Sequence, residues 1–262
     1  MYDFEFDRPR TIAEAVDALR QEDAQALGGG QTLIPTMKQR LAMPSRLVSV
    51  REIAEMRFVR PADGMICIGG ATAHATVAAE VAAVFPALAA LAGQIGDPAV
   101  RNRGTIGGSL ANNDPSACYP AAVLASDAII ATDRREIAAD DYFQGMFTTA
   151  LDEGELITEI RFPVPERANY QKFEQPASRF ALVGVFVAQR AGGVRVAVTG
   201  ASDDGVYRWV EAEEALTQRF HGDAIKGITV PEDGMISDLH GSAAYRAHLV
   251  AVLTAQAVAA AG

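Results

Sequence analysis

The chain has 262 residues, 49% of them hydrophobic and 21% charged, and carries a formal net charge of −10 at pH 7. This composition is typical of a globular protein with one large core or a few smaller ones. The acidic balance excludes nucleic acid as the main partner, because phosphate binding requires clustered Lys and Arg.

The first 70 residues predict one helix and several short strands. Residues 11–22 repeat apolar side chains at helical spacing, with Thr11 as the N-cap. The stretch AQALGG predicts a short strand that leads into three consecutive glycines. A short helical turn is expected near Pro35, over TMKQRLAMP, and strands are expected at 46–50 and 64–70.

The middle of the chain mixes helical and strand patterns. An Ala-rich stretch at 72–95 predicts two helices divided by Pro86. A second glycine-rich segment at 101–120 is expected to form a loop. It leads into a helix, a strand at 128–132 and a further strand at 154–165.

After residue 165 the pattern changes to longer strands and then helices. Strands are expected at 180–190, 194–200 and 206–210, and helices at 211–218 and 242–260. The chain is therefore predicted to be an α+β protein in two parts. Residues 1–165 form a cofactor-binding region, and residues 166–262 form a smaller α+β domain.

Cysteine and histidine usage limits the metal chemistry. Cys67 and Cys118 are the only cysteines, so an iron–sulfur cluster bound by four cysteines is excluded within this chain. The four histidines form no metal-binding array, and we expect them to lie on the surface or to be hydrogen-bonded. No apolar run approaches the roughly 20 residues of a transmembrane segment. The N-terminus lacks a signal-peptide layout, so we expect a cytoplasmic protein.

The first glycine segment is a candidate binding site. Gly28, Gly29 and Gly30 can adopt positive φ without steric cost, so successive amide N–H groups can converge on one anion. Gln31 and Thr32 add side-chain donors beside them.

The second segment offers the same backbone freedom. Gly104, Gly107 and Gly108 surround Thr105 and Ile106, and two such segments could clamp a diphosphate from both sides. Neither segment matches the G-x-G-x-x-G or the G-x-x-x-x-G-K-[ST] motif, so a Rossmann or P-loop nucleotide site is excluded. From the residues alone, a cofactor clamp and a pair of structural turns both remain open.

The stretches GGGQTLIPTMKQR and IGDPAVRNRGTIGGSLANNDPSACYPAAVLA resemble the flavin-binding subunits of molybdenum hydroxylases. That family includes the medium subunit of carbon monoxide dehydrogenase and the central domain of xanthine dehydrogenase. The likeness continues through GELITEIRFP, YQKFEQPASRFALVGVFVA and SDLHGSAAYRAHLVAVL, so it covers nearly the whole chain in the right order.

The resemblance implies a FAD-binding domain of the vanillyl-alcohol-oxidase (PCMH) type. Its two lobes would span about 1–55 and 56–165, followed by the C-terminal flavin-subunit domain at 166–262. In this family FAD lies extended between the lobes. Its pyrophosphate lies at the two glycine segments, and its isoalloxazine lies near the C-terminal domain.

The resemblance also implies the FAD-binding residues. Those of the first segment are Leu27, Gly28, Gly29, Gly30, Gln31, Thr32, Leu33 and Ile34. Those of the second are Thr105, Ile106, Gly107, Gly108 and Ser109, with Ile95 before them and Asp114 after them, where Asp114 is expected to fix its loop.

Two further positions match residues near the isoalloxazine, namely Ile157 and Lys172. A lysine there stabilises negative charge on the reduced flavin. The alternative for Lys172 is a solvated lysine at a strand end.

One position departs from the family pattern. Four residues after Asp114 the family commonly carries a second Asp that contacts the sugar-like chain of the flavin, whereas this chain has Cys118. A thiol is a weak hydrogen-bonding group. The contact is therefore lost, made by the backbone, or supplied by Asn112 or Asn113.

The implied function is electron relay without a catalytic acid, base or nucleophile on this chain. In the resembled complexes, a large subunit with the molybdenum cofactor hydroxylates the substrate. Electrons then pass through two [2Fe–2S] clusters of a small subunit to FAD and on to an external acceptor. The resemblance therefore implies both partner subunits in a heterotrimer, alone or dimerised.

Two other classes of protein stay open. One is a flavin-free assembly subunit, which Cys118 favours and the intact glycine segments disfavour. The other is a self-contained flavin oxidase, which the lack of a flavin-attachment motif and of a separate substrate domain disfavours. The substrate and the electron acceptor are not indicated by the sequence.

Overall fold

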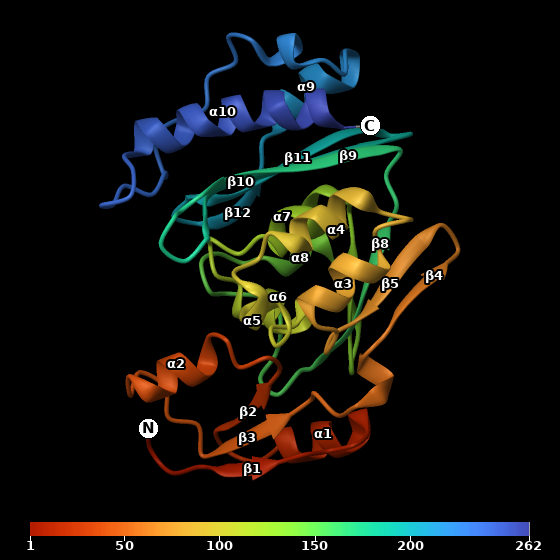
Figure 1. The fold of residues 1–262 in the computed structure, drawn as a ribbon, viewed down its shortest axis with the longest axis vertical. Helices are drawn as coiled ribbons and strands as arrows, with labels where there is room; N and C mark the ends of the chain where they lie inside the picture. Colours follow the sequence, from red (N-terminus) through yellow and green to blue (C-terminus); the bar gives the residue numbers. More distant parts are fainter. Residues whose placement is uncertain (262) are drawn as a thin grey trace.

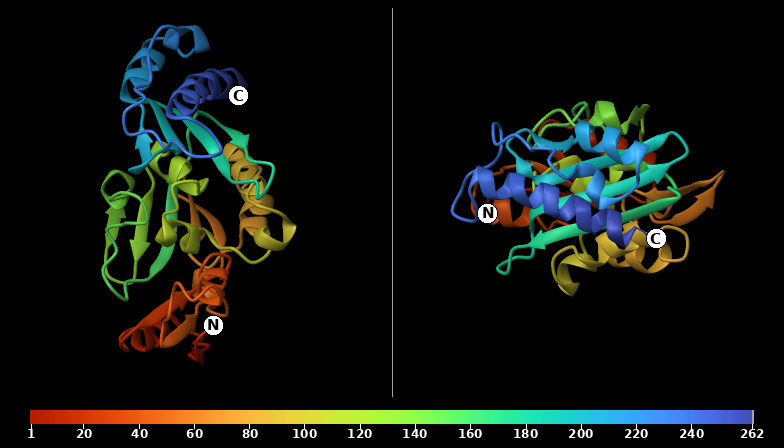
Figure 2. Two further views of the ribbon diagram at one scale, coloured as in Figure 1. Left: turned by 90° about the vertical axis from the view of Figure 1, so that its left-hand side faces the viewer. Right: turned by 90° about the horizontal axis from the view of Figure 1, so that it is seen from above.

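The computed structural model describes residues 1–261, which form three β-sheets arranged along the long axis of the molecule (Figure 1). A three-stranded sheet lies at the N-terminal end, a five-stranded sheet lies in the middle, and a four-stranded sheet carries the C-terminal helices. The left view of Figure 2 shows the same order from the side.

The N-terminal sheet consists of β1 (Glu5–Asp7), β2 (Ala24–Leu27) and β3 (Arg46–Ser49), parallel and in the order β1-β3-β2. Helix α1 (Ile12–Leu19) lies within the predicted range, and the Thr11 hydroxyl accepts from the N–H of Glu14 as the expected N-cap. Its apolar face packs with Val48 and Val50 in a small core. Strand β1 was not predicted.

Helix α2 (Leu33–Lys38) corrects the prediction for the segment after the glycines. The helix begins at Leu33, two residues before Pro35, and ends near Arg40, whose φ of 63° is left-handed. Proline is tolerated this early in a helix because the first N–H groups have no intrahelical acceptor. The Gly-rich segment therefore runs directly into a helix N-terminus.

The middle sheet is antiparallel, in the order β4-β5-β8-β6-β7. Its strands are β4 (Val59–Ala62), β5 (Met65–Gly69), β6 (Ile129–Thr132), β7 (Glu136–Ala138) and β8 (Ile157–Pro163). The predicted strands at 64–70, 128–132 and 154–165 are confirmed as β5, β6 and β8. Strands β4 and β7 were not predicted, and both lie at the sheet edges.

Helices fill the space around this sheet. They are α3 (His74–Glu80), α4 (Pro86–Gly93), α5 (Pro98–Arg101), α6 (Ile106–Asn112), α7 (Tyr119–Ala125) and α8 (Ala139–Tyr142), with the 3₁₀ turn η1 (Ala54–Met56) before them. Pro86 opens α4 and so divides the Ala-rich stretch as predicted. The loop prediction for 101–120 is wrong over α6, because Thr105 caps a helix there.

The C-terminal sheet is antiparallel in the order β12-β11-β10-β9. It contains β9 (Arg167–Glu174), β10 (Ala181–Arg190), β11 (Gly193–Ser202) and β12 (Gly205–Arg208). Helices α9 (Val210–Gln218) and α10 (Ala243–Ala260) pack on its outer face, with the 3₁₀ turn η2 (Gly222–Ile225) beside them (Figure 1). The predictions at 180–260 are confirmed, whereas β9 was not predicted.

The inner face of this sheet covers the middle of the molecule. Helix α7 packs against β10, β11 and β12, and α4 packs against β9. Strand β10 is buried on both faces, from Ala181 to Ala188. Ion pairs join the two parts, with Asp127 bound by Arg190 at 3.0 Å and Asp140 bound by Arg195 at 2.9 Å. The middle of the chain and the C-terminal sheet therefore share one core.

None of the helices in residues 1–261 is long and apolar enough to cross a membrane.

Candidate functional site

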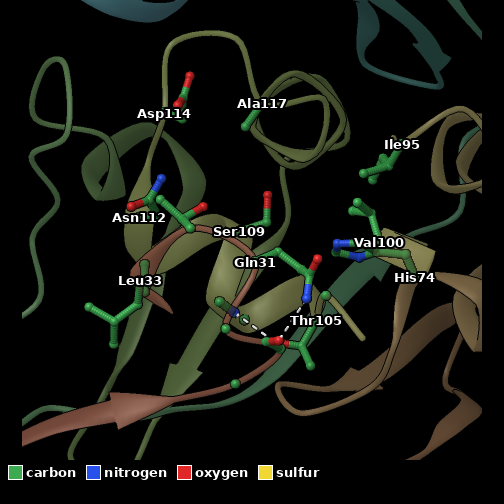
Figure 3. A pocket seen from close by; sticks show the side chains of 18 of the residues that line it. Gln31, Leu33, His74, Ile95, Val100, Thr105, Ser109, Asn112, Asp114 and Ala117 are labelled. Carbon is green, nitrogen blue, oxygen red and sulfur yellow. Dashed lines mark hydrogen bonds between the residues drawn. The ribbon is translucent and has the colours of Figure 1, made fainter. Parts of the chain in front are cut away.

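A cleft of about 640 Å³ lies where the N-terminal sheet meets the helices of the middle region. Its wall combines segments that are far apart in the sequence: the first glycine segment, the N-terminus of α3, the helices α5 and α6, the turn before α7, and the hairpin between β9 and β10. Figure 3 shows side chains from several of these segments around one space. The volume lies in the ordinary range for a cofactor site.

Close packing explains two glycines of the first segment. A Cβ atom on Gly28 would lie 2.6 Å from the hydroxyl of Thr105, and one on Gly29 would overlap the backbone of Arg103 and Gly104. Gly30 has a φ of 70°, which is left-handed and favours glycine. The two glycine segments therefore touch each other directly, and together they form one side of the cleft.

The first segment also presents free hydrogen-bond donors. The amide N–H groups of residues 28–33 donate to no acceptor among residues 1–261. All six of these residues line the cleft. Successive free amides of this kind form a concavity that suits phosphate oxygens.

The second segment is different, and it corrects the prediction of a clamp made from two sets of backbone amides. The N–H of Ile106 donates to Thr72 O at 3.1 Å, the N–H of Gly107 to Gly70 O at 2.9 Å, and the N–H of Gly108 to the hydroxyl of Thr105 at 3.2 Å. These amides are used inside the fold. The segment supplies a close-packed surface instead of amide donors.

Gly107 and Gly108 have different surroundings. A Cβ on Gly107 would lie 2.6 Å from the carbonyl oxygen of Gly70, within the turn after β5. Gly108 is exposed, and the single atom near its Cβ position is the Thr105 hydroxyl at 2.9 Å. Gly107 is therefore needed for packing, whereas Gly108 leaves part of the cleft surface bare.

Residues near the other end of the cleft come from the turn before α7 and from β9. Asp114 accepts a hydrogen bond from the N–H of Ser116 at 2.8 Å, the geometry expected of a residue that fixes this loop. Cys118 is buried and lines the cleft. The side-chain amide of Asn113 donates to Gly145 O and Thr148 O, so it is not available to replace the cofactor contact expected at position 118. Asn112, by contrast, lines the cleft.

Lys172 lies within β9, opposite Gly184, and donates its ammonium group to the carbonyl of Gln94 at 3.0 Å. The lysine is half-buried near the C-terminal end of β9, and its ammonium group is hydrogen-bonded to the chain. This hydrogen bond holds the lysine between the C-terminal sheet and the end of α4, where it lines the same cleft as Ile157.

The structure brings nearly all of the predicted binding residues to one cleft. All of them line it except Ile34, which lies in α2 beside Gly30, and Ile106, which is fully buried in the core. Both isoleucines have structural positions one residue away from cleft-lining residues.

Sequence reasoning missed several cleft residues. Phe147, Glu155, Arg179 and Phe180 reach the cleft from segments with no binding motif. Burial raises the pKa of the Glu155 carboxyl, but hydrogen bonds from Arg135, from the N–H of Asp152 and from Thr132 outweigh it and lower the pKa to about 2. The ionised carboxylate fixes the turn before β8.

His74 corrects the prediction of surface or hydrogen-bonded histidines. It is the first residue of α3, only 5% exposed, and its Nδ1 has no hydrogen-bond partner. Desolvation, together with the nearby positive charge of Arg101, lowers its pKa to about 4. No sequence motif marks this position, because only the folded chain brings it to the cleft.

Residues 2–165 match the family model described as the FAD binding domain in molybdopterin dehydrogenase. The chain belongs to this family. Its cofactor is FAD, and it is a subunit of an oxidoreductase of the molybdenum hydroxylase class.

Similar proteins of nearly the same length support the membership. The chain is 32% identical to the carbon monoxide dehydrogenase medium chain of Hydrogenophaga pseudoflava, covering 98% of this chain and 96% of the relative. It is 33% identical to the nicotine 6-hydroxylase medium subunit of Paenarthrobacter nicotinovorans, with 97% and 95% covered. The solved carbon monoxide dehydrogenase from H. pseudoflava matches with a TM-score of 0.89 at 32% identity, covering 99% and 97% of the two chains.

The cleft fits FAD on its own geometry. Six free amides suit the pyrophosphate, the bare surface of Gly108 admits a close approach, and the far end combines apolar side chains with one ammonium group. FAD combines an anionic pyrophosphate with apolar rings, and the cleft offers both amide donors and apolar surface.

Proposed function

We propose that the chain holds FAD in this cleft as the electron-transferring subunit of a heterotrimeric molybdenum hydroxylase. Electrons arrive from the [2Fe–2S] clusters of a small subunit and leave to an external acceptor. The molybdenum cofactor resides on a large subunit. The observation that carries the proposal is the row of unbonded amides at residues 28–33, in the same cleft as the exposed Gly108.

In this proposal the amides of residues 28–33 bind the pyrophosphate, and Asn112 takes over the contact that Cys118 is too weak to make. Ile157 and Lys172 lie beside the isoalloxazine. When bound, FAD supplies the redox chemistry. Lys172 supplies a fixed positive charge that stabilises negative charge on the reduced ring.

We further propose that residues 1–165 form the two-lobed PCMH-type FAD-binding domain, with lobes at about 1–55 and 56–165. Residues 166–262 then form the C-terminal flavin-subunit domain. The separate N-terminal sheet, the five-stranded sheet and the four-stranded sheet support this division. The cleft draws residues from all three parts.

The alternative of a self-contained flavin oxidase has less support. The relatives that match nearly end to end are named as medium chains or medium subunits, and this chain spans 95–97% of their lengths. The alternative of a flavin-free assembly subunit conflicts with the unbonded amides and with membership of a FAD-binding family.

We assign substrate specificity to the large subunit. The relatives act, by name, on carbon monoxide, nicotine and glyceraldehyde, yet this chain is 32–34% identical to each of them. Equal similarity across unlike substrates supports a flavin subunit that does not contact the substrate.

The proposal is tested by co-purifying the chain with its partners and releasing the flavin with acid. We expect FAD at about one per copy of this chain, together with molybdenum and iron from the other subunits. A colourless chain that binds no added FAD would show that the cleft does not hold the cofactor.

A further inference from the structure

The imidazole of His74 stands in the wall of the cleft without a partner. Its backbone N–H donates to the carbonyl of Gly104 at 3.0 Å, which anchors the start of α3 against the second glycine segment. The residue is only 5% exposed, and its Nδ1 is enclosed by the chain and makes no hydrogen bond. In Figure 3 the ring points from its side of the cleft toward Gln31 and Ser109.

The groups that surround the ring cannot satisfy it. Val100 is apolar, and the ring of Tyr119 lies 5.3 Å away, centroid to centroid, at a tilt of 49°. The guanidinium of Arg101 donates instead to the carbonyls of Ile95 at 3.1 Å and Gly96 at 2.7 Å. The chain itself therefore offers no partner to either ring nitrogen, and Nε2, unlike Nδ1, is not enclosed.

The second glycine segment makes room for this histidine. A Cβ on Gly104 would lie 2.5 Å from His74 Nε2, so any other residue there would displace the ring. Gly104 is part of the same stretch that approaches Gly29. The glycine at 104 is thus explained by the imidazole beside it, and the imidazole is held at the cleft by the glycine.

A buried polar group without a partner is destabilising, and such groups are rare in folded proteins. A neutral imidazole carries one N–H donor and one acceptor nitrogen. Phosphate and carbonyl oxygens of FAD accept hydrogen bonds, so a neutral donor in the cleft wall has a partner as soon as the cofactor is bound.

We propose that His74 is a FAD-binding residue that donates a hydrogen bond from Nε2, the ring nitrogen that is not enclosed by the chain, to an acceptor oxygen of the bound cofactor. This inference rests on the proposed function, because it requires FAD in the cleft. Burial keeps the imidazole neutral, since its pKa of about 4 lies well below neutral pH. The residue acts by binding and orienting the cofactor, and it transfers no proton.

The test compares His74→Gln with His74→Leu in the full-length chain freed of flavin. A Gln side-chain amide reaches about as far as Nε2 and keeps a donor, whereas Leu keeps apolar volume without one. FAD titration by flavin fluorescence is expected to give a dissociation constant about tenfold higher for His74→Leu and within about threefold of the wild type for His74→Gln, where tenfold corresponds to about 1.4 kcal/mol.

A second measurement follows the His74 ring nitrogens directly, by ¹⁵N NMR of the wild-type chain with and without FAD. We expect the Nε2 resonance to shift when FAD is added. The proposal is overturned if His74→Leu binds FAD as the wild type does, if both variants lose affinity equally, or if the Nε2 resonance does not move. If the wild-type chain binds no FAD at all, the proposed function itself fails, which is a different result.

Discussion

Alanine substitutions at two adjacent glycines of α6 are expected to have different effects, one on the stability of the fold and the other on FAD affinity. In Gly107→Ala the new Cβ would lie 2.6 Å from the carbonyl oxygen of Gly70, which also accepts the Gly107 N–H at 2.9 Å. Backbone lies on both sides of the contact, so neither side can rotate away. Overpacking of this kind costs about 1–3 kcal/mol, and weakening the hydrogen bond costs about 1 kcal/mol more.

Replacing glycine by alanine inside a helix stabilises the helix by about 0.5–1 kcal/mol. We therefore expect Gly107→Ala to lower the free energy of unfolding by about 2 kcal/mol. In Gly108→Ala the Cβ meets only the Thr105 hydroxyl at 2.9 Å. A weakened N-cap costs about 1 kcal/mol, which the gain in helix propensity offsets, so the stability of the flavin-free chain is expected to stay close to that of the wild type.

The FAD affinities should separate the two positions. Gly108 is exposed on the cleft surface, so its new methyl group stands where the cofactor is proposed to lie, and we expect the dissociation constant to rise at least about tenfold, or about 1.4 kcal/mol. Urea unfolding of the flavin-free chain and FAD titration measure the two effects. Wild-type stability in Gly107→Ala would refute the packing argument. Wild-type FAD affinity in Gly108→Ala would refute the placement of FAD against α6.

Three further outcomes are expected. Gly93→Ala, in α4 with no atom within 4 Å of the new Cβ, should raise the free energy of unfolding by about 0.5–1 kcal/mol, and a loss of stability would contradict the open surroundings of that position. The pKa of His74 is about 4 in the folded chain and ordinarily 6.5. Between pH 6.5 and pH 4 the imidazole is therefore protonated in the unfolded chain but neutral in the folded one. Stability should therefore fall by about 3 kcal/mol as the pH drops from 6.5 to 4, a loss absent from His74→Leu in urea unfolding. Lys172→Gln removes a positive charge proposed to lie beside the isoalloxazine and should lower the reduction potential of bound FAD by on the order of 30 mV; a potentiometric titration with no change would place the lysine away from the ring.

Local patterns were sufficient for the elements whose signal is contained in their own residues. The N-cap Thr11, the division of the Ala-rich stretch at Pro86 and the long strands β10 and β11 all follow from short-range chemistry. The strands that were missed lack such a signal. Strand β9 carries the charged and polar run RANYQKFE, and it is held as a strand by pairing with β10.

The candidate site shows the same division. The resemblance selected residues that nearly all line one cleft, because the glycine segments carry their pattern in the sequence. The sequence does not show which glycines are required for packing and which leave the cleft surface open. Gly29 and Gly107 pack against other backbone, whereas Gly108 stays open, and only the contacts of distant segments decide which is which.

The sequence by itself indicated the family, the cofactor class and the two glycine segments of the site, because the motifs that carry the family resemblance are present in the chain. The tertiary structure decided which amides remain free to bind a ligand. Those of residues 28–33 have no acceptor within residues 1–261, while those of 106–108 are bonded to Gly70, Thr72 and Thr105. It also decided the position of His74, because burial and the loss of hydrogen-bond partners arise only when α3, α5 and the second glycine segment pack together.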